Sequence, residues 1–233
     1  MAALARPRYA TIGPGCERRG GAVGQATGTY GGRSAQERRT ERRERFLAAA
    51  LQQFGDRPGY RAASVAGVCE AAGLSTRQFY EEFRNLEQVL AALHLLVNDR
   101  TEQAVLRVLT DTAGLGFEQR IGAVLRAYIT AATDDRRRLR IAFVEIIGVS
   151  EELERQRLTR RSRWVELIVA EAEAAVGRGE IAPRDFRIAA TAFIGAVNGL
   201  LHDWTAGQFE ATLGQVVDEL VALLLGSVRR PGA

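Results

Sequence analysis

The stretch from Ser64 to Leu90, SVAGVCEAAGLSTRQFYEEFRNLEQVL, contains two short helical patterns separated by a glycine turn. Ser64 is a predicted N-cap for the first helix, residues 65–71, and the turn centres on Gly73. Ser75 then caps a second short helix. Two helices joined by a tight turn of this size are typical of a helix-turn-helix unit, whose second helix can enter the major groove of DNA.

The second helix has a well-defined start. Ser75 and Gln78 have the spacing of a capping box, in which the hydroxyl accepts from the third helical N–H and the glutamine reaches back to the cap. Leu74 and Phe79 occupy the positions of a hydrophobic staple, which sets the angle at which the chain enters the helix. Phe79 and Phe83 share one helix face and are therefore predicted to lie in the core.

The opposite face of this helix carries the candidate DNA contacts. The guanidinium of Arg77 can bridge O6 and N7 of guanine, a contact worth about 1–3 kcal/mol of discrimination. A solvent-exposed or phosphate-binding arginine is the alternative. The hydroxyl of Tyr80 and the helix start at Ser64 are predicted to hold phosphate oxygens, although capping alone accounts for Ser64. Gln78 ranks below Arg77 because the capping box engages its side chain. The predicted DNA-binding set is Ser64, Ser75, Thr76, Arg77, Gln78 and Tyr80.

Helical patterns surround this unit, and no strand pattern competes with them. Ser34 and Glu37 form another capping box, which predicts a helix that ends within residues 55–59, with Gly55 as its C-terminal glycine. Beyond Asn85, apolar spacing predicts six longer helices at about residues 86–112, 117–132, 136–149, 151–176, 183–203 and 210–228. We therefore expect an all-α protein with a disordered, basic, glycine-rich tail (1–33), a helix-turn-helix domain (34–84) and a larger helical domain (85–228).

The composition argues against several classes of protein. Among 233 residues there are two cysteines, Cys16 and Cys69, and their separation indicates neither a disulfide framework nor a zinc site. There is no signal-peptide pattern and no apolar run long enough to span a bilayer, so we expect a cytoplasmic protein without a membrane partner. Catalytic motifs are absent, and His94 and His202 are the only imidazoles. We therefore expect no enzymatic activity, no metal and no cofactor.

A larger set of residues follows a defined order between residues 54 and 90. The set comprises Phe54, Gly59-Tyr60, Ser64-Val65, Val68, Ala72-Gly73-Leu74-Ser75, Phe79-Tyr80, Phe83, Glu87 and Leu90. It resembles the DNA-binding region of the tetracycline-repressor (TetR) family of bacterial regulators. The resemblance implies that residues 85–228 bind a ligand and dimerise. It also implies a repressor that binds a palindromic double-stranded DNA operator as a homodimer and is released by a small-molecule effector.

Two positions depart from the pattern of that family. Glu82 and Leu86 stand where its members commonly carry partners for phosphate. Together with Glu81, Glu82 is expected to repel the DNA backbone, which predicts weak non-specific binding and a modest salt dependence. The alternative function is accordingly a helical binding or architectural protein with degenerate, non-specific DNA binding.

The last two predicted helices resemble the pair that forms the dimer interface in this family. The helix after Pro183 is apolar almost all round and rich in Ala and Gly, and the last helix has an apolar stripe from Leu213 to Leu224. We expect a homodimer through these two helices, with a purely intramolecular core as the alternative.

The effector pocket is expected to be largely apolar, with a few directed polar groups. The candidate lining residues are Tyr128, Phe143, Trp164, Asn198, His202 and Trp204. Glu145 is expected to reach solvent. The arginines between Arg155 and Arg163 alternate with glutamates, which favours a solvated helix face over a site for an anionic ligand.

Overall fold

The computed structural model describes residues 34–228, which form helices, turns and loops with no β-strand among them. The prediction of an all-α fold is thereby confirmed. The predicted tail, residues 1–33, lies outside the described residues, as do residues 229–233. No helix within the described range is long and apolar enough to cross a membrane.

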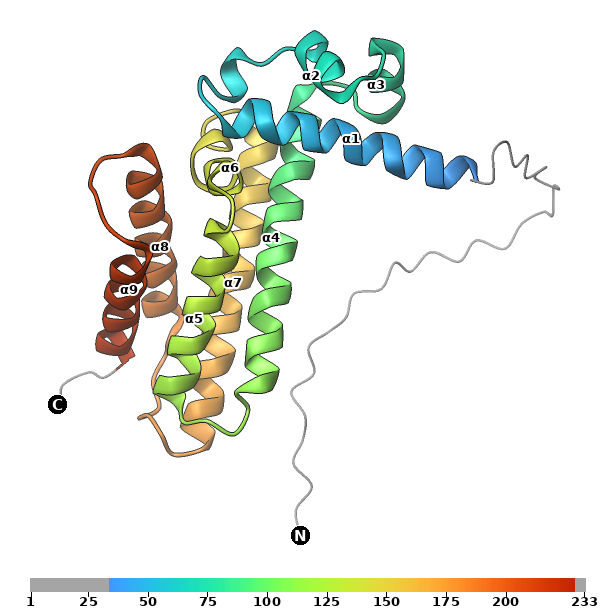
Figure 1. The fold of residues 1–233 in the computed structure, drawn as a ribbon. Helices are drawn as coiled ribbons and strands as arrows, with labels where there is room; N and C mark the ends of the chain where they lie inside the picture. Colours follow the sequence, from blue (N-terminus) through green and yellow to red (C-terminus); the bar gives the residue numbers. More distant parts are fainter. Residues whose placement is uncertain (1–33, 229–233) are drawn as a thin grey trace, which may run out of the picture.

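Nine α-helices follow one another along residues 34–228. They are α1 (Ala35–Gly55), α2 (Val65–Ala72), α3 (Thr76–Glu82), α4 (Leu86–Asp111), α5 (Phe117–Thr133), α6 (Arg136–Arg140), α7 (Glu151–Gly177), α8 (Arg187–Ala206) and α9 (Leu213–Val228). A 3₁₀ turn, η1 (Tyr60–Ala62), precedes α2, and a π-helical segment, η2 (Ile141–Glu145), continues α6. Figure 1 shows α1 lying across one end of the bundle of α4, α5 and α7, with α2 and α3 above it and α8 and α9 along the flank.

The helix-turn-helix domain is built on a cluster of phenylalanines. Phe46 of α1 meets Phe79 and Phe83 edge-on, with ring centroids 5.4 and 6.4 Å apart. All three rings are buried, as predicted for the two on the second helix of the motif. Because Phe46 comes from α1, this packing fixes the orientation of α3 relative to α1.

The helical domain has a second core, to which the last helix contributes. Val216, Val217, Leu220 and Leu224 of the predicted stripe are buried in the same cluster as residues of α5 and α8. These four residues therefore face this chain's own interior, whereas Leu213 and Val221 of the same stripe are partly exposed.

The segment that follows α5 differs from the single helix predicted at 136–149. After one turn and a half of α-helix, the backbone changes to π-helical geometry at η2 and ends near Gly148, where φ is +68°. Neighbouring side chains of this segment enter different cores: Phe143 is buried in the helical domain, whereas Ile141 and Ile146 are buried in the core of the helix-turn-helix domain. Residues 136–146 thus belong to both domains at once.

Two helices begin later than predicted. Helix α8 starts at Arg187 and not at Pro183, and the carboxylate of Asp185 accepts from the N–H of Arg187 at 2.8 Å. Helix α9 starts after Thr212, because Thr212 and Gln215 form a reciprocal capping pair: each side chain accepts from the other's N–H, at 3.3 and 2.9 Å. The sequence contains this cap, and the prediction of a start at residue 210 overlooked it.

Gly55 has a different role from the one predicted. It is the last residue of α1, and the chain leaves the helix through Asp56 in an extended conformation, so no left-handed glycine ends the helix. A methyl group on Gly55 would lie 2.2 Å from Cβ of Arg137 on α6. Gly55 is therefore required for the close approach of α1 and α6.

Candidate functional site

Local caps hold the recognition helix α3 in place. The hydroxyl of Ser75 accepts from the N–H of Gln78 at 3.3 Å, and Oε1 of Gln78 accepts from the N–H of Ser75 at 2.9 Å. The predicted capping box is therefore confirmed. Ser64 caps α2 in the same manner, accepting from the N–H of Gly67 at 3.1 Å.

The turn between α2 and α3 has an anchor that sequence reasoning missed. Gly73 adopts a left-handed conformation with φ +61°, which suits a residue without Cβ. The guanidinium of Arg45 on α1 donates to the carbonyls of Ala72 and Gly73, at 2.7 and 3.1 Å. These carbonyls lie at the end of α2, where backbone acceptors lack helical partners. Arg45 thus ties the turn to the same helix that carries Phe46.

The candidate DNA contacts lie on the outer face of this unit. The side chain of Arg77 is 90% exposed, and its Nε lies 3.5 Å from a carboxylate oxygen of Glu81, a weak surface pair. Tyr80 is 58% exposed, and its ring stands edge-on to buried Phe79. Ser64, Ser75 and Thr76 are also exposed, whereas Gln78 is half-buried. Direct contact of these residues with DNA remains a prediction.

The expectation that Glu82 repels the DNA backbone is wrong. Its carboxylate is 1% exposed and is paired with Arg39 and Arg42 of α1, with both N–O distances at 3.1 Å. The guanidinium of Arg43 donates to the carbonyl of Glu82 at 3.3 Å and stacks over the ring of Phe83. Glu82 is therefore an internal clamp between α3 and α1. Its charge is neutralised there.

Glu145 connects the helical domain to the helix-turn-helix domain. Its side chain is 8% exposed, so the expectation that it reaches solvent is wrong. One oxygen accepts from the N–H of Tyr60 at 2.9 Å, and the other is paired with Arg140. Gly59 allows this approach: its φ is +98°, and a Cβ there would lie 2.7 Å from the carboxylate. A contact of η2 with η1 thus spans the two domains.

A small apolar cavity lies inside the helical domain. It has a volume of about 50 Å³, and α4, α5, α7, α8 and α9 all contribute to its lining. Its aromatic wall is made by Tyr128, Trp164 and Phe193, of which the first two meet edge-on with centroids 4.9 Å apart. This volume is well below the roughly 300–1,000 Å³ of occupied ligand pockets, so a ligand must widen it.

A second, more polar cavity adjoins the first through the same two rings. Its volume is about 30 Å³, and Tyr128 and Trp164 line both cavities. The polar lining comprises His94, Asn98, Arg157, Arg160, Arg161 and Asn198. Burial raises the pKa of the Tyr128 phenol, so the hydroxyl stays protonated. That hydroxyl has no hydrogen-bond partner among residues 34–228.

The six predicted effector residues do not all line one cavity. Four of them, Tyr128, Phe143, Trp164 and Asn198, surround the polar cavity together. His202 is not in its lining, and its Nδ1 lies 2.7 Å from the carbonyl of Phe143. Trp204 lines a separate cleft near the end of α1. Ligand binding at all six positions stays a prediction.

Part of the arginine-rich face of α7 points inward. Arg157, Arg160 and Arg161 are only partly exposed and line the polar cavity. Each has a partner within the chain: Glu154 for Arg157, Asp99 and Glu102 for Arg160, and the carbonyl of Thr191 for Arg161. The prediction of a wholly solvated face is therefore wrong. The sequence pattern could not show it, because the acids on α4 lie about 60 residues away from α7.

Two family models match the chain. Residues 46–93 match the model for bacterial regulatory proteins of the tetR family, and residues 114–228 match the model for the tetracyclin repressor-like C-terminal domain. The chain belongs to the TetR family. No curated protein matches it.

Solved structures share the fold along most of the chain. The fatty acid degradation regulator FadR from Bacillus halodurans is 19% identical, with a TM-score of 0.69, over 82% of this chain and 97% of that one. FadR from Bacillus subtilis, in complex with stearoyl-CoA, is 17% identical, with a TM-score of 0.67, over 80% and 99%. AibR, in complex with isovaleryl coenzyme A and operator DNA, is 22% identical, with a TM-score of 0.61, over 78% and 97%.

In this TetR-family chain, one outer face of α8 carries exposed apolar residues, both large and small. Ile188 is 81% exposed, and Ala192 and Gly199 are exposed on the same helix. On α9, Leu223 is 47% exposed. These residues lie on the faces that the intramolecular core leaves uncovered, whereas four residues of the α9 stripe, Val216, Val217, Leu220 and Leu224, are buried.

Proposed function

We propose that this TetR-family regulator is a dimeric repressor that acts in the cytoplasm and releases a two-fold symmetric operator when an amphiphilic effector binds. One observation carries the proposal: an apolar cavity and an arginine-lined cavity meet at Tyr128 and Trp164 in the helical domain, which contacts the domain of the exposed recognition helix through Glu145 and Tyr60. Ligand binding can regulate DNA binding in this arrangement because the small cavities must widen to admit a ligand. Neighbouring segments, which include η2, must then move.

The effector that we propose is an acyl thioester of coenzyme A. An acyl chain suits the apolar cavity, the unpartnered hydroxyl of Tyr128 suits its carbonyl oxygen, and the arginines of α7 suit its phosphates. The solved structures of Bacillus subtilis FadR and of AibR contain stearoyl-CoA and isovaleryl coenzyme A. These ligands support the same chemical class for this chain.

An operator selected from genomic fragments tests the DNA-binding half of the proposal. Arg77→Ala is expected to cost about 1–3 kcal/mol at one base position of each half-site, whereas Tyr80→Phe should weaken all sites equally. Arg163→Ala, at an exposed position on α7, is the matched control and should leave binding unchanged. If the unaltered protein binds every duplex with the same affinity, the proposal is contradicted and an architectural protein is favoured.

Release by effector is tested on the same operator by fluorescence anisotropy. Acyl-CoAs of increasing chain length should release the labelled duplex, whereas coenzyme A without an acyl chain should not. Tyr128→Phe removes only the hydroxyl, so it should raise the half-maximal effector concentration about tenfold while leaving operator affinity intact. Release by coenzyme A alone, or no release by any acyl-CoA, would refute the proposed effector.

The dimer interface that we propose is the outer face of α8 with the adjoining part of α9. Ile188→Arg places a charge on that face and should shift the protein toward monomers in analytical ultracentrifugation. Leu115→Arg, at an exposed leucine in the loop between α4 and α5, is the control and should leave the dimer intact. A dimer that survives Ile188→Arg would require another interface.

A further inference from the structure

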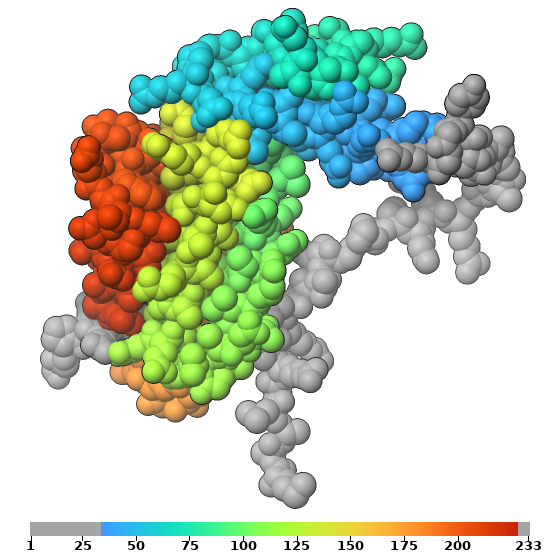
Figure 2. All heavy atoms as spheres, viewed as in Figure 1, coloured from blue at the N-terminus to red at the C-terminus, as the bar shows by residue number. Residues whose placement is uncertain are grey.

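A cleft lies between the two domains, away from both effector cavities. Its volume is about 600 Å³, and three segments line it: the end of α1 with the following loop, the α5–α6 turn with α6, and the end of α8. It shares no lining residue with either cavity beside Tyr128. Figure 2 shows the surface of α1 reaching over α6 toward the α8–α9 pair on this face.

The lining of the cleft is positively charged. Arg57, Arg136 and Arg140 contribute to it, and Asp56 is the acid in that lining. Arg57 and Arg136 are exposed and have no ion-pair partner among the described residues. Nε of Arg140 is buried without a hydrogen-bond partner in that same part of the chain, although its terminal nitrogen is paired with Glu145.

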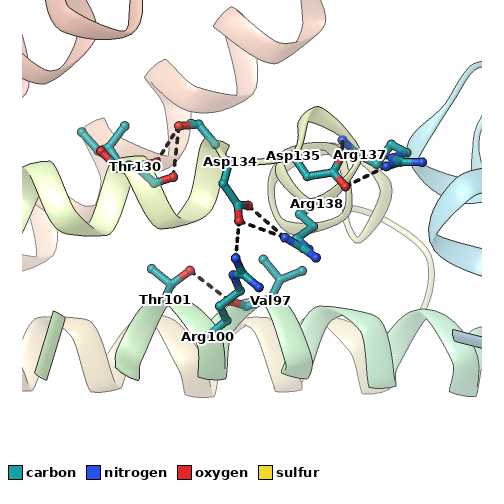
Figure 3. A network of polar contacts seen from close by, with 10 residues as sticks. Val97, Arg100, Thr101, Thr130, Asp134, Asp135, Arg137 and Arg138 are labelled. Atoms are coloured by element: carbon teal, nitrogen blue, oxygen red, sulfur yellow. Dashed lines mark hydrogen bonds and ion pairs between the residues drawn. The ribbon is translucent and has the colours of Figure 1, made fainter. Parts of the chain in front are cut away.

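Nearby acids do not compensate these guanidinium groups, because other arginines already engage them. Figure 3 shows Asp134 held between Arg100 and Arg138, at 2.5 and 2.9 Å, and Asp135 held by Arg137 at 3.0 Å. Asp135 raises the pKa of the Arg137 guanidinium, chiefly by hydrogen bonding. The negative charge of Asp56 also raises the pKa of Arg137, so the Asp56 carboxylate interacts with that guanidinium. The acids around the α5–α6 turn are thus occupied, and the cleft keeps an excess of positive charge.

The remaining wall of the cleft has a large, fixed aromatic side chain. Trp204 is half-buried, and its Nε1 donates to the carbonyl of Ala211 at 3.1 Å, which holds the indole in place. Leu139 adds apolar surface, and Thr133 and Thr205 supply hydroxyl groups. Guanidinium groups beside an aromatic wall suit a ligand that combines a phosphate with a planar ring.

We propose that this cleft is a second ligand site, which takes a phosphorylated molecule with a planar ring such as a nucleotide. Its occupant contacts Arg57 on the DNA-binding side and Arg136 on α6, so it ties the two domains together. The occupant also reaches Arg140, the partner of Glu145, which accepts from the N–H of Tyr60. The site therefore adjoins the contact through which the helical domain holds the DNA-binding domain.

Direct binding tests this proposal without DNA and without an acyl effector, so it fails or succeeds separately from the proposed function. The chain has two tryptophans, so the fluorescence of a Trp164→Phe variant reports on Trp204 alone. ADP should change this fluorescence saturably, and pyrophosphate and adenosine should each bind more weakly. Calorimetry on the unaltered full chain should give the same ADP affinity if Trp164→Phe leaves the cleft unchanged.

Charge variants locate the site. Arg57→Ala and Arg136→Ala should each weaken ADP binding about tenfold, the scale of one charge-assisted contact. Arg126→Ala, which removes an exposed arginine of α5 outside the cleft, should leave it unchanged. Absence of saturable binding, unchanged affinity in both cleft variants, or pyrophosphate binding as tight as ADP binding would overturn the proposal.

One further arm identifies the source of the nucleotide. If saturating acyl-CoA leaves ADP binding unchanged, the cleft serves a free nucleotide. If acyl-CoA displaces ADP, and Arg136→Ala weakens that displacement, the cleft holds the nucleotide part of the coenzyme. If acyl-CoA displaces ADP equally well from the unaltered chain, from Arg57→Ala and from Arg136→Ala, the ADP binds outside the cleft. That result would contradict the proposal.

Discussion

Acidification should destabilise this protein through one buried histidine, His94. The residue is 3% exposed, and its Nδ1 lies 3.0 Å from Nε2 of Gln156, which donates to it. That contact requires Nδ1 to be unprotonated. Burial, and then the positive charges of Arg160 and Arg157, lower the pKa of His94 to about 4. In the folded chain the imidazole is therefore neutral at physiological pH.

The magnitude follows from the difference between the folded and unfolded pKa values. An unfolded chain has an ordinary histidine pKa of about 6.5, so it binds a proton between pH 6.5 and 4 that the folded chain does not bind. Stability is fully present above pH 6.5 and is lost as the pH falls toward 4. At pH 5 the loss from this residue alone is about 2 kcal/mol.

Urea unfolding, followed by circular dichroism at pH 7.5 and pH 5, measures this effect. The unaltered chain should lose about 2 kcal/mol more stability on acidification than His94→Gln, which keeps a partner for Gln156 and removes the titrating group. Carboxylates that titrate in the same range contribute equally to both and cancel. An equal loss in His94→Gln would refute the reasoning.

Two further substitutions test the packing around the DNA-binding domain. Glu82→Ala leaves two arginines without their carboxylate and should destabilise the fold by about 1–3 kcal/mol in urea unfolding; unchanged stability would show that the clamp contributes nothing. Gly55→Ala sets a methyl group 2.2 Å from Cβ of Arg137 and should cost about 1–3 kcal/mol, seen as a lower Tm. Gly114→Ala, which meets open space, is the control, and an equal effect of both substitutions would contradict the close approach.

The parts of the fold that depend on neighbouring residues could be predicted from the sequence. The caps at Ser34, Ser64 and Ser75 and the turn at Gly73 use interactions within three or four residues, and all of them are in place. The predicted starts of helices farther along the chain were less accurate, because a capping residue and the apolar pattern can indicate different first residues. At Thr212 the cap determined where α9 begins.

Interactions between distant segments could not be predicted in this way. The sequence around Glu82 does not show whether this residue faces DNA or a pair of arginines about 40 residues earlier. The aromatic candidates for the effector site were chosen by residue type. Tyr128 of α5 and Trp164 of α7 meet because both side chains point into the interior of the helical domain, whereas Trp204 lies at the end of α8 and faces another space. Packing between helices decides such groupings.

The η2 segment indicates how events in the cavities reach the recognition helix. Phe143 lines the polar cavity, Ile141 and Ile146 lie in the core of the DNA-binding domain, and Glu145 accepts from the N–H of Tyr60. Under the proposed function, a ligand that widened the cavity would displace Phe143, and because these residues are contiguous, the contacts of η2 with the other core would change with it. Coupling of this kind is reciprocal. An effector that weakens operator binding must therefore itself bind more weakly to the protein held on DNA, by the same factor.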